Sequence, residues 1–179
     1  MVTYLIESYG SFYLDQLLID HPVFYNWKTD TARYNYWLSV IDKIKRGYWF
    51  LDLDWSGWDE NLKDAIYQVA LDCILDVLDT YAPDFRRFEP YLRKAVNGAF
   101  LKGYKRRTTL SGLASGRRWT TLLNSVINAA FILYAAQMTG INAEGSDILV
   151  TLGDDSQTVV PSKESAETLM EFLNSLGVS

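Results

Sequence analysis

Two short β-prone runs, residues 148–152 and 156–160, flank the tripeptide Gly153-Asp154-Asp155. Glycine and aspartate between two such runs are typical of a tight β-hairpin turn. The pattern predicts two antiparallel neighbouring strands with adjacent carboxylates at the tip of the turn. A fold that contains this hairpin must hold two acidic side chains together at one edge of a small antiparallel sheet.

A third run, residues 48–54, is rich in aromatic residues and ends in Asp54. Its short, partly alternating pattern predicts a buried strand with an acid at its C-terminal end. Asp52 lies on the same strand face as Asp54, because side chains alternate along a strand. Spacing favours Asp54 as the functional acid, and Asp52 is expected to be solvated or to lie behind it.

The rest of the chain is predicted to be mainly helical, because its apolar residues recur at helical spacing. Ser162 is a good N-cap for the last helix. The predicted helices cover residues 4–20, 30–46, 60–80, 84–98, 116–138 and 162–173, and a basic, Thr-rich hairpin or loop covers 99–114. In the second helix one face carries Tyr34, Trp37, Leu38, Ile41 and Ile44. The order of elements predicts an α+β fold with a small antiparallel β-sheet packed on helices.

Composition excludes several classes of protein. The chain has 179 residues, 49% hydrophobic and 22% charged, which suits one domain with a sizeable core and not a disordered chain. A single cysteine, Cys73, and a single histidine, His21, exclude an internal disulfide, a cysteine-rich zinc site and a histidine cluster. Cys73 is expected to be a core thiol, and His21 a helix-end residue. The apolar run 125–139 is shorter than the roughly 20 residues of a membrane span.

The net charge of -5 conceals an uneven distribution. Residues 86–118 contain ten basic side chains and one acidic side chain, so the acidic excess lies elsewhere in the chain. A basic segment of this kind is suited to phosphate contact. The side chains expected to contact RNA or phosphate are Lys105, Arg106, Arg107, Arg117 and Arg118.

Three clusters carry the candidate chemistry: Asp54-Trp55-Ser56-Gly57-Trp58-Asp59 after the first strand, residues 115–124 from Ser115-Gly116 to Asn124, and Gly153-Asp154-Asp155 at the hairpin tip. Acids at strand ends are the ligands that a pair of hard divalent cations requires. Two such ions about 4 Å apart can hold the attacking and leaving oxygens of a phosphoryl transfer.

These clusters, in this order, resemble motifs A, B and C in the palm of viral RNA-dependent RNA polymerases: Asp-x4-Asp, then Ser-Gly-x3-Thr-x3-Asn, then Gly-Asp-Asp. The stretches 53–59 and 152–156 are most similar to polymerases of the partitivirus and picobirnavirus type, from double-stranded RNA viruses. The resemblance implies template-directed transfer of nucleotides from nucleoside triphosphates to an RNA 3′-hydroxyl. It also implies an RRM-like palm sheet.

Roles follow from this resemblance residue by residue. Asp54, Asp154 and Asp155 match the catalytic acids and would hold two Mg²⁺ or Mn²⁺ ions. Asp59 and Asn124 match the pair that recognises the ribose 2′-hydroxyl, a group that both donates and accepts hydrogen bonds. The remaining nucleotide-binding positions implied by the resemblance are Ser115, Gly116 and Thr120.

The resemblance covers the middle of a polymerase. Residues 1–47 resemble a partial fingers segment, and residues 48–179 resemble the palm through motif C and the start of motif D. The thumb and most of the fingers have no counterpart here, so the isolated chain is expected to be inactive in processive synthesis. Implied partners are template and nascent RNA, nucleoside triphosphates, the remaining fingers and thumb, and viral capsid protein, with no membrane span. The implied location is the host cytoplasm or the virion interior.

Two alternatives remain open at this point. A reverse-transcriptase-like palm uses the same metal chemistry, although Asp59, Asn124 and Gly153 favour a ribonucleotide polymerase. An inactive palm could instead serve as a binding or assembly module. Each acid also has a simpler explanation as a turn or N-cap residue, and Trp58 and Trp119 are expected to be core residues rather than base-stacking platforms.

Overall fold

A computed structural model describes residues 2–55, 58, 62, 64–96, 99–102, 107–110, 119–141 and 149–177. The chain divides into two compact units. The sheet unit consists of Leu18–Ser56 and Asn124–Ser179, and the helical unit consists of Met1–Leu17 and Gly57–Leu123. Each unit therefore combines segments that are distant in sequence.

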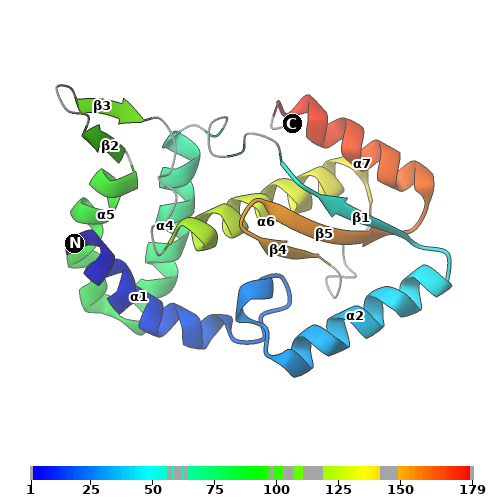
Figure 1. Ribbon diagram of the computed structural model, residues 1–179, viewed down its shortest axis with the longest axis horizontal. Coiled ribbons are helices and arrows are strands. Elements are labelled where there is room, and N and C mark those ends of the chain that lie inside the picture. Colours follow the sequence, from blue (N-terminus) through cyan, green and yellow to red (C-terminus); the bar gives the residue numbers. More distant parts are fainter. Residues whose placement is uncertain are drawn as a thin grey trace. The chain divides into compact units, whose positions relative to one another are not determined.

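The sheet unit contains a three-stranded antiparallel sheet of order β1-β5-β4 (Figure 1). Strand β1 is Trp49–Leu53, β4 is Val150–Leu152 and β5 is Asp155–Val160. The β4–β5 hairpin and the strand that precedes Asp54 are confirmed. Because β5 pairs with both other strands, the second strand of the predicted hairpin is the centre of the sheet.

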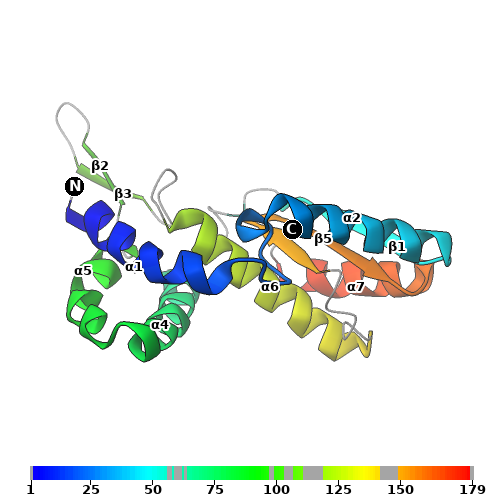
Figure 2. The same cartoon turned by 90° about the horizontal axis from the view of Figure 1, so that it is seen from below.

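Helices cover both faces of this sheet (Figures 1 and 2). Helix α2, Asp30–Lys45, packs on one face, where Tyr36 and Val40 form a core cluster with Val150. Helix α7, Lys163–Ser175, and the part of α6, Thr120–Thr139, that belongs to the sheet unit lie on the other face. The predicted cap of α7 is confirmed, since the Ser162 hydroxyl accepts a hydrogen bond from the backbone N–H of Ser165.

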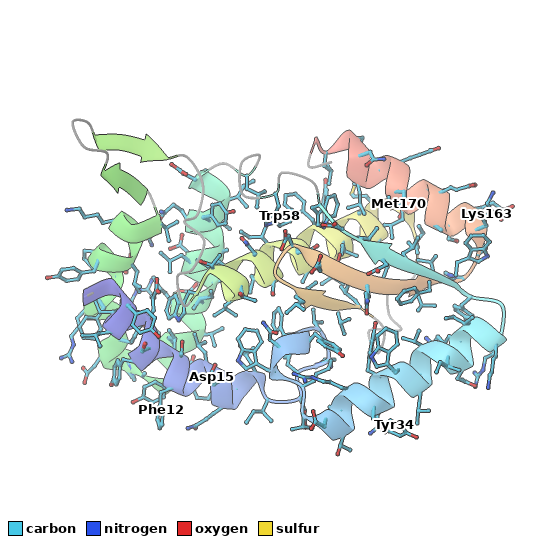
Figure 3. All side chains as sticks on the ribbon, in the orientation of Figure 1. Phe12, Asp15, Tyr34, Trp58, Lys163 and Met170 are labelled. Carbon is cyan, nitrogen blue, oxygen red and sulfur yellow. The ribbon has the colours of Figure 1, made fainter. Side chains whose placement is uncertain are left out.

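The apolar face predicted for α2 is not the face that packs on the sheet. Tyr34 is 64% exposed, and Leu38, Ile41 and Ile44 are also exposed. Figure 3 shows Tyr34 projecting from α2 away from the sheet. Helical periodicity shows which residues share a face but not which face contacts the sheet. The face that packs on the sheet carries Tyr36, whose ring is buried and whose hydroxyl donates a hydrogen bond to Gln157.

The helical unit is built mainly from α1, Val2–Leu18, which ends in the sheet unit, and α4, Asp64–Tyr81. After α4 come a 3-10 segment, η2 (Pro83–Phe88), and α5 (Glu89–Val96). The expected 99–114 hairpin is confirmed as β2, Ala99–Lys102, paired antiparallel with β3, Arg107–Leu110. The buried core of this unit includes Tyr67, Leu71, Leu75, Leu78, Phe85, Trp58 and Trp119. The two tryptophans are therefore core residues, as predicted.

One expectation about this unit is wrong. Cys73 is exposed, because the buried face of α4 runs through Ala70, Leu71, Ile74 and Leu75 and turns Cys73 outward. In the basic segment 86–118, two arginines are paired with acids, some of which lie outside the segment. Arg86 forms ion pairs with Asp76, Asp79 and Glu89, and Arg93 forms them with Asp72 and Glu89. These two arginines support local packing rather than a free phosphate-binding surface.

Helix α6 is the one helix of the described residues that is long and apolar enough to cross a bilayer. Within the protein, 56% of its apolar window is buried. Its polar side chains Ser125 and Asn128 are fully buried and hydrogen-bonded to the β4–β5 hairpin. Burial of this kind is that of a core helix, which accounts for its apolar composition.

Candidate active site

The acidic residues of the first and third clusters meet where β1 ends and β5 begins. The last paired residues are Leu53 and Ser156, so Asp54 and Asp155 follow as neighbours across the two strands. Asp154 occupies the hairpin turn beside Gly153, whose φ of 68° lies in the region that glycine adopts readily. Pairing of β1 with β5 thus brings together acids that are about 100 positions apart in sequence.

A pocket of about 400 Å³ opens on this part of the sheet. Its acidic lining residues are Asp52, Asp54 and Asp155. The other lining residues are aromatic, aliphatic or uncharged polar residues: Tyr25, Trp37, Val150, Thr151, Leu152, Ser156 and Gln157. The described lining residues include no Lys, Arg or His. The pocket is therefore an anionic hollow with an apolar wall.

Electrostatics link all four carboxylates of this region. The pKa of Asp155 is raised above its ordinary value, first by partial loss of hydration of the carboxyl group and then by the charges of Asp154, Asp54 and Asp52. Like charges disfavour one another's ionised forms, so the effect requires that these groups lie near Asp155. Asp154 is not part of the pocket lining, but its charge acts on the same residue.

Asp52 lines the pocket, whereas the sequence predicted a solvated residue or one that lies behind Asp54. Its Oδ1 accepts a hydrogen bond of 3.2 Å from Gln157 Nε2, and Gln157 Oε1 accepts one of 3.1 Å from the Tyr36 hydroxyl. Tyr36 is buried, and its pKa is raised chiefly by that burial. The expected position of Asp52 on the face of Asp54 is confirmed, and a buried tyrosine holds it there through Gln157.

Two side chains of α6 form hydrogen bonds to the hairpin tip, and the sequence did not predict a functional role for either of them. Ser125 Oγ accepts a 2.7 Å hydrogen bond from the backbone N–H of Gly153. Asn128 Nδ2 donates to the backbone oxygens of Gly153, Asp154 and Asp155 at 3.3, 2.7 and 3.2 Å. The only available signal was that these two polar residues interrupt a mainly apolar stretch of the helix.

The nucleotide-binding positions are described only in part. Thr120 begins α6 and is partly buried, and Asn124 lies one helical turn later and is buried. The i, i+4 relation expected for this pair is confirmed by the helix. Outside the described residues lie Asp59, Ser115, Gly116, Lys105, Arg106, Arg117 and Arg118, and only the backbone of Arg107 is described, within β3. Their roles stay predictions.

The donor chemistry of the pocket fits a hard divalent cation. Carboxylate oxygens are the ligands that Mg²⁺ prefers, and mutually repelling carboxylates are stabilised by a bound cation. In the part of the chain that the structure describes, no group of three or more His, Cys, Asp or Glu side chains is already arranged to hold a metal ion. The fit is thus one of ligand type and location, and coordination requires the side chains to reorient.

Comparison with known proteins gives a consistent result. The profile of the family described as viral RNA-dependent RNA polymerase matches residues 27–179. A genome polyprotein of Bovine enteric calicivirus Newbury agent-1 is 26% identical over 151 residues, which cover 79% of this chain and 7% of the polyprotein. A genome polyprotein of Theiler's murine encephalomyelitis virus is 28% identical over 121 residues, which cover 66% of this chain and 5% of the polyprotein.

A third relative carries an enzymatic name. The probable RNA-directed RNA polymerase of Helminthosporium victoriae virus-190S is 36% identical over 92 residues, which cover 49% of this chain and 11% of that protein. The chain therefore spans about a tenth or less of the length of the curated relatives it matches. The profile match extends from before α2 to beyond the end of α7 and includes all three candidate clusters.

Proposed function

Since this chain belongs to the viral RNA-dependent RNA polymerase family, we propose that it is the catalytic palm segment of such an enzyme. The observation that carries the proposal is the meeting of Asp54 and Asp155 in one anionic pocket, next to Asp154. Clustering acids that have only a structural role in turns destabilises the fold, because the carboxylates repel one another. Acids that bind cations cluster because the bound cation offsets this repulsion.

The proposed reaction is template-directed transfer of a nucleotide from a nucleoside triphosphate to an RNA 3′-hydroxyl. Asp54, Asp154 and Asp155 would hold two Mg²⁺ ions, with Mn²⁺ as a substitute. When bound, such ions stabilise negative charge on the attacking and leaving oxygens. The carboxylates supply hard anionic ligands, and the apolar wall formed by Tyr25 and Trp37 limits water on one side of the pocket.

Ribonucleotide selection is proposed for Asp59 and Asn124. A carboxylate accepts and an amide both donates and accepts, so together they suit a 2′-hydroxyl. Ser115, Gly116 and Thr120 are proposed to adjust the same subsite, and Lys105, Arg106, Arg107, Arg117 and Arg118 are proposed to contact phosphate or RNA. If the polymerase that contains this chain incorporates deoxyribonucleotides as well as ribonucleotides, the reverse-transcriptase alternative gains support instead.

Finer assignments rest on the sequence motifs. We propose a partitivirus- or picobirnavirus-type lineage from residues 53–59 and 152–156, an RRM-like palm over residues 48–179 and a partial fingers segment over 1–47. The proposed partners are template and nascent RNA, nucleoside triphosphates, the rest of the fingers and thumb, and capsid protein. The proposed site of action is the host cytoplasm or the virion interior.

Metal binding by the chain tests the central claim. Mn²⁺ titration followed by electron paramagnetic resonance would compare the wild-type chain with Asp54→Asn and Asp154→Asn. Glu171→Gln on α7 is the matched control, because it removes an exposed carboxylate that does not line the pocket. We expect both aspartate variants to bind at least about tenfold more weakly, since each loses an anionic ligand.

Equal affinity in all four proteins would refute the metal site. Primer extension by the polymerase that contains this chain then tests catalysis, and the same aspartate variants are expected to abolish it. Intact metal binding without any synthesis by that polymerase would favour the alternative of an inactive binding or assembly module. We expect little processive synthesis from the 179-residue chain alone.

A further inference from the structure

We infer that Ser125 and Asn128, the α6 bracket, are positioning residues that set the acidic hairpin tip against the end of β1. The inference rests on the proposed function and adds residues that contact neither metal nor nucleotide. Both side chains are fully buried, and they lie three residues apart on α6, so they present to the same neighbour. That neighbour is the β4–β5 hairpin.

Ser125 holds the first half of the tip. Its hydroxyl oxygen accepts from the backbone N–H of Gly153 at 2.7 Å, and its own backbone oxygen accepts from the Thr151 hydroxyl at 3.2 Å. Thr151 and Gly153 are both buried. A buried N–H without a partner is costly, so the turn is most stable where Ser125 places its oxygen.

Asn128 holds the second half and links it to the other acidic segment. One NH₂ group donates to three successive backbone oxygens, from Gly153 to Asp155. The amide oxygen accepts a 3.0 Å hydrogen bond from the indole N–H of Trp55, the residue that follows Asp54. A single amide therefore connects the neighbour of Asp54 to the backbone of Asp154 and Asp155.

An amide suits this position chemically. Backbone oxygens only accept and an indole N–H only donates, so the group between them must donate on one side and accept on the other. A carboxylate would face three oxygens without a proton to donate, and an aliphatic side chain would leave all of these buried groups without this partner. Repelling carboxylates at the tip tend to separate, and the α6 bracket opposes that movement through the backbone.

The test compares Ser125→Ala, Asn128→Leu and Trp55→Phe with Gln137→Ala, an exposed polar residue of the same helix. The first readout needs no metal: amide exchange of Gly153 and the indole N–H signal of Trp55 by NMR in the full chain. We expect Gly153 exchange at least about tenfold faster in Ser125→Ala, and loss of the shifted, protected Trp55 indole signal in Asn128→Leu. Unchanged exchange and an unchanged indole signal would overturn the inference.

The second readout separates positioning from general stability. We expect Asn128→Leu to weaken Mn²⁺ binding at least about fivefold relative to Leu173→Ala, a core variant of α7 compared at the temperature where both are equally folded. In the polymerase that contains this chain, kcat should fall at least about tenfold while KM for the nucleotide changes less than about threefold. Equal metal affinity and equal kcat in the two variants would assign the α6 bracket a purely structural role.

The two failures are distinguishable. If the wild-type chain binds no Mn²⁺, the proposed function fails, and the NMR readout still decides whether the α6 bracket orders the tip. If the wild-type chain binds Mn²⁺ but the bracket variants match their controls, only the inference fails. If Asn128→Leu does not fold, Ser125→Ala and Trp55→Phe carry the comparison, since each removes one hydrogen bond rather than four.

Discussion

Asp155→Asn should stabilise the metal-free chain. Asp155 is surrounded by the charges of Asp154, Asp54 and Asp52, which raise its pKa together with partial loss of hydration. Carboxylates on neighbouring strand positions lie roughly 5 to 8 Å apart and, in water, repel by about 0.5 to 0.8 kcal/mol per pair. Three neighbours give roughly 1.5 to 2.5 kcal/mol at low ionic strength, or a Tm increase of roughly 3 to 10 °C for a chain of this length.

The sign of the effect follows from linkage. A carboxyl whose folded-state pKa is raised contributes stability below its unfolded value of 3.8, and that contribution is lost as the pH rises through the folded pKa. The gain from Asp155→Asn should therefore be present at pH 7 and absent near pH 3. Thermal unfolding in EDTA, followed by circular dichroism at both pH values and again in 0.5 M KCl (about a 4 Å Debye length), measures it.

Metal should narrow the difference in stability between the variant and the wild-type chain. At a Mn²⁺ concentration of about ten times the Kd, the wild-type chain gains about 1.4 kcal/mol, whereas the variant has lost a ligand and gains less. Glu171→Gln controls for the loss of a carboxylate elsewhere in the sheet unit. A variant that is less stable than wild type in EDTA at pH 7, or a gain equal to that of Glu171→Gln, would refute the argument that these acids repel one another.

Three further predictions concern the site and its supports. Affinity for Mn²⁺ should fall between pH 7 and pH 5 more in the wild-type chain than in Asp155→Asn, because protons compete for a carboxyl with a raised pKa; parallel titrations with the same pH dependence would contradict this. Tyr36→Phe removes the hydrogen bond to Gln157 and should lower the free energy of unfolding, measured by urea denaturation, by about 0.5 to 1.5 kcal/mol. An unchanged urea midpoint would show that this hydrogen bond does not stabilise the fold. Gly10→Ala should destabilise the helical unit, because the added Cβ would lie 2.6 Å from Trp119 and 2.7 Å from Phe85. Such overpacking costs about 1 to 3 kcal/mol and outweighs the helix preference of alanine over glycine, which is about 1 kcal/mol. A stabilised variant would contradict this packing.

Local features of this chain were predictable because their causes are local. The hairpin around Gly153 follows from a glycine turn between two β-prone runs, and the α7 cap follows from Ser162 before a helical pattern. The strand predicted over residues 48–54 is observed as Trp49–Leu53, within one residue at each end. Sequence order and spacing also identified the family that the profile match supports.

The predictions of buried and exposed side chains were wrong where they depended on which neighbouring element a helix packs against. Periodicity grouped Tyr34 with Leu38 and Ile41, but the sheet packs on the side of Tyr36 and Val40. Cys73 lies on a helix whose buried stripe passes beside it. These outcomes depend on which partner surface is available, and a hydrophobic pattern alone does not contain that information.

The sequence by itself determined the kinds of elements, the oxygen-donor chemistry of Asp54, Asp154 and Asp155, and the family. Tertiary structure alone decided that β1 pairs with β5, so that Asp54 and Asp155 share a pocket with Asp52. It also decided that two buried amide and hydroxyl groups of α6 hold the hairpin tip. The physical reason is that strand register and burial join residues separated by 25 to about 100 positions, and such contacts form only when the whole unit packs.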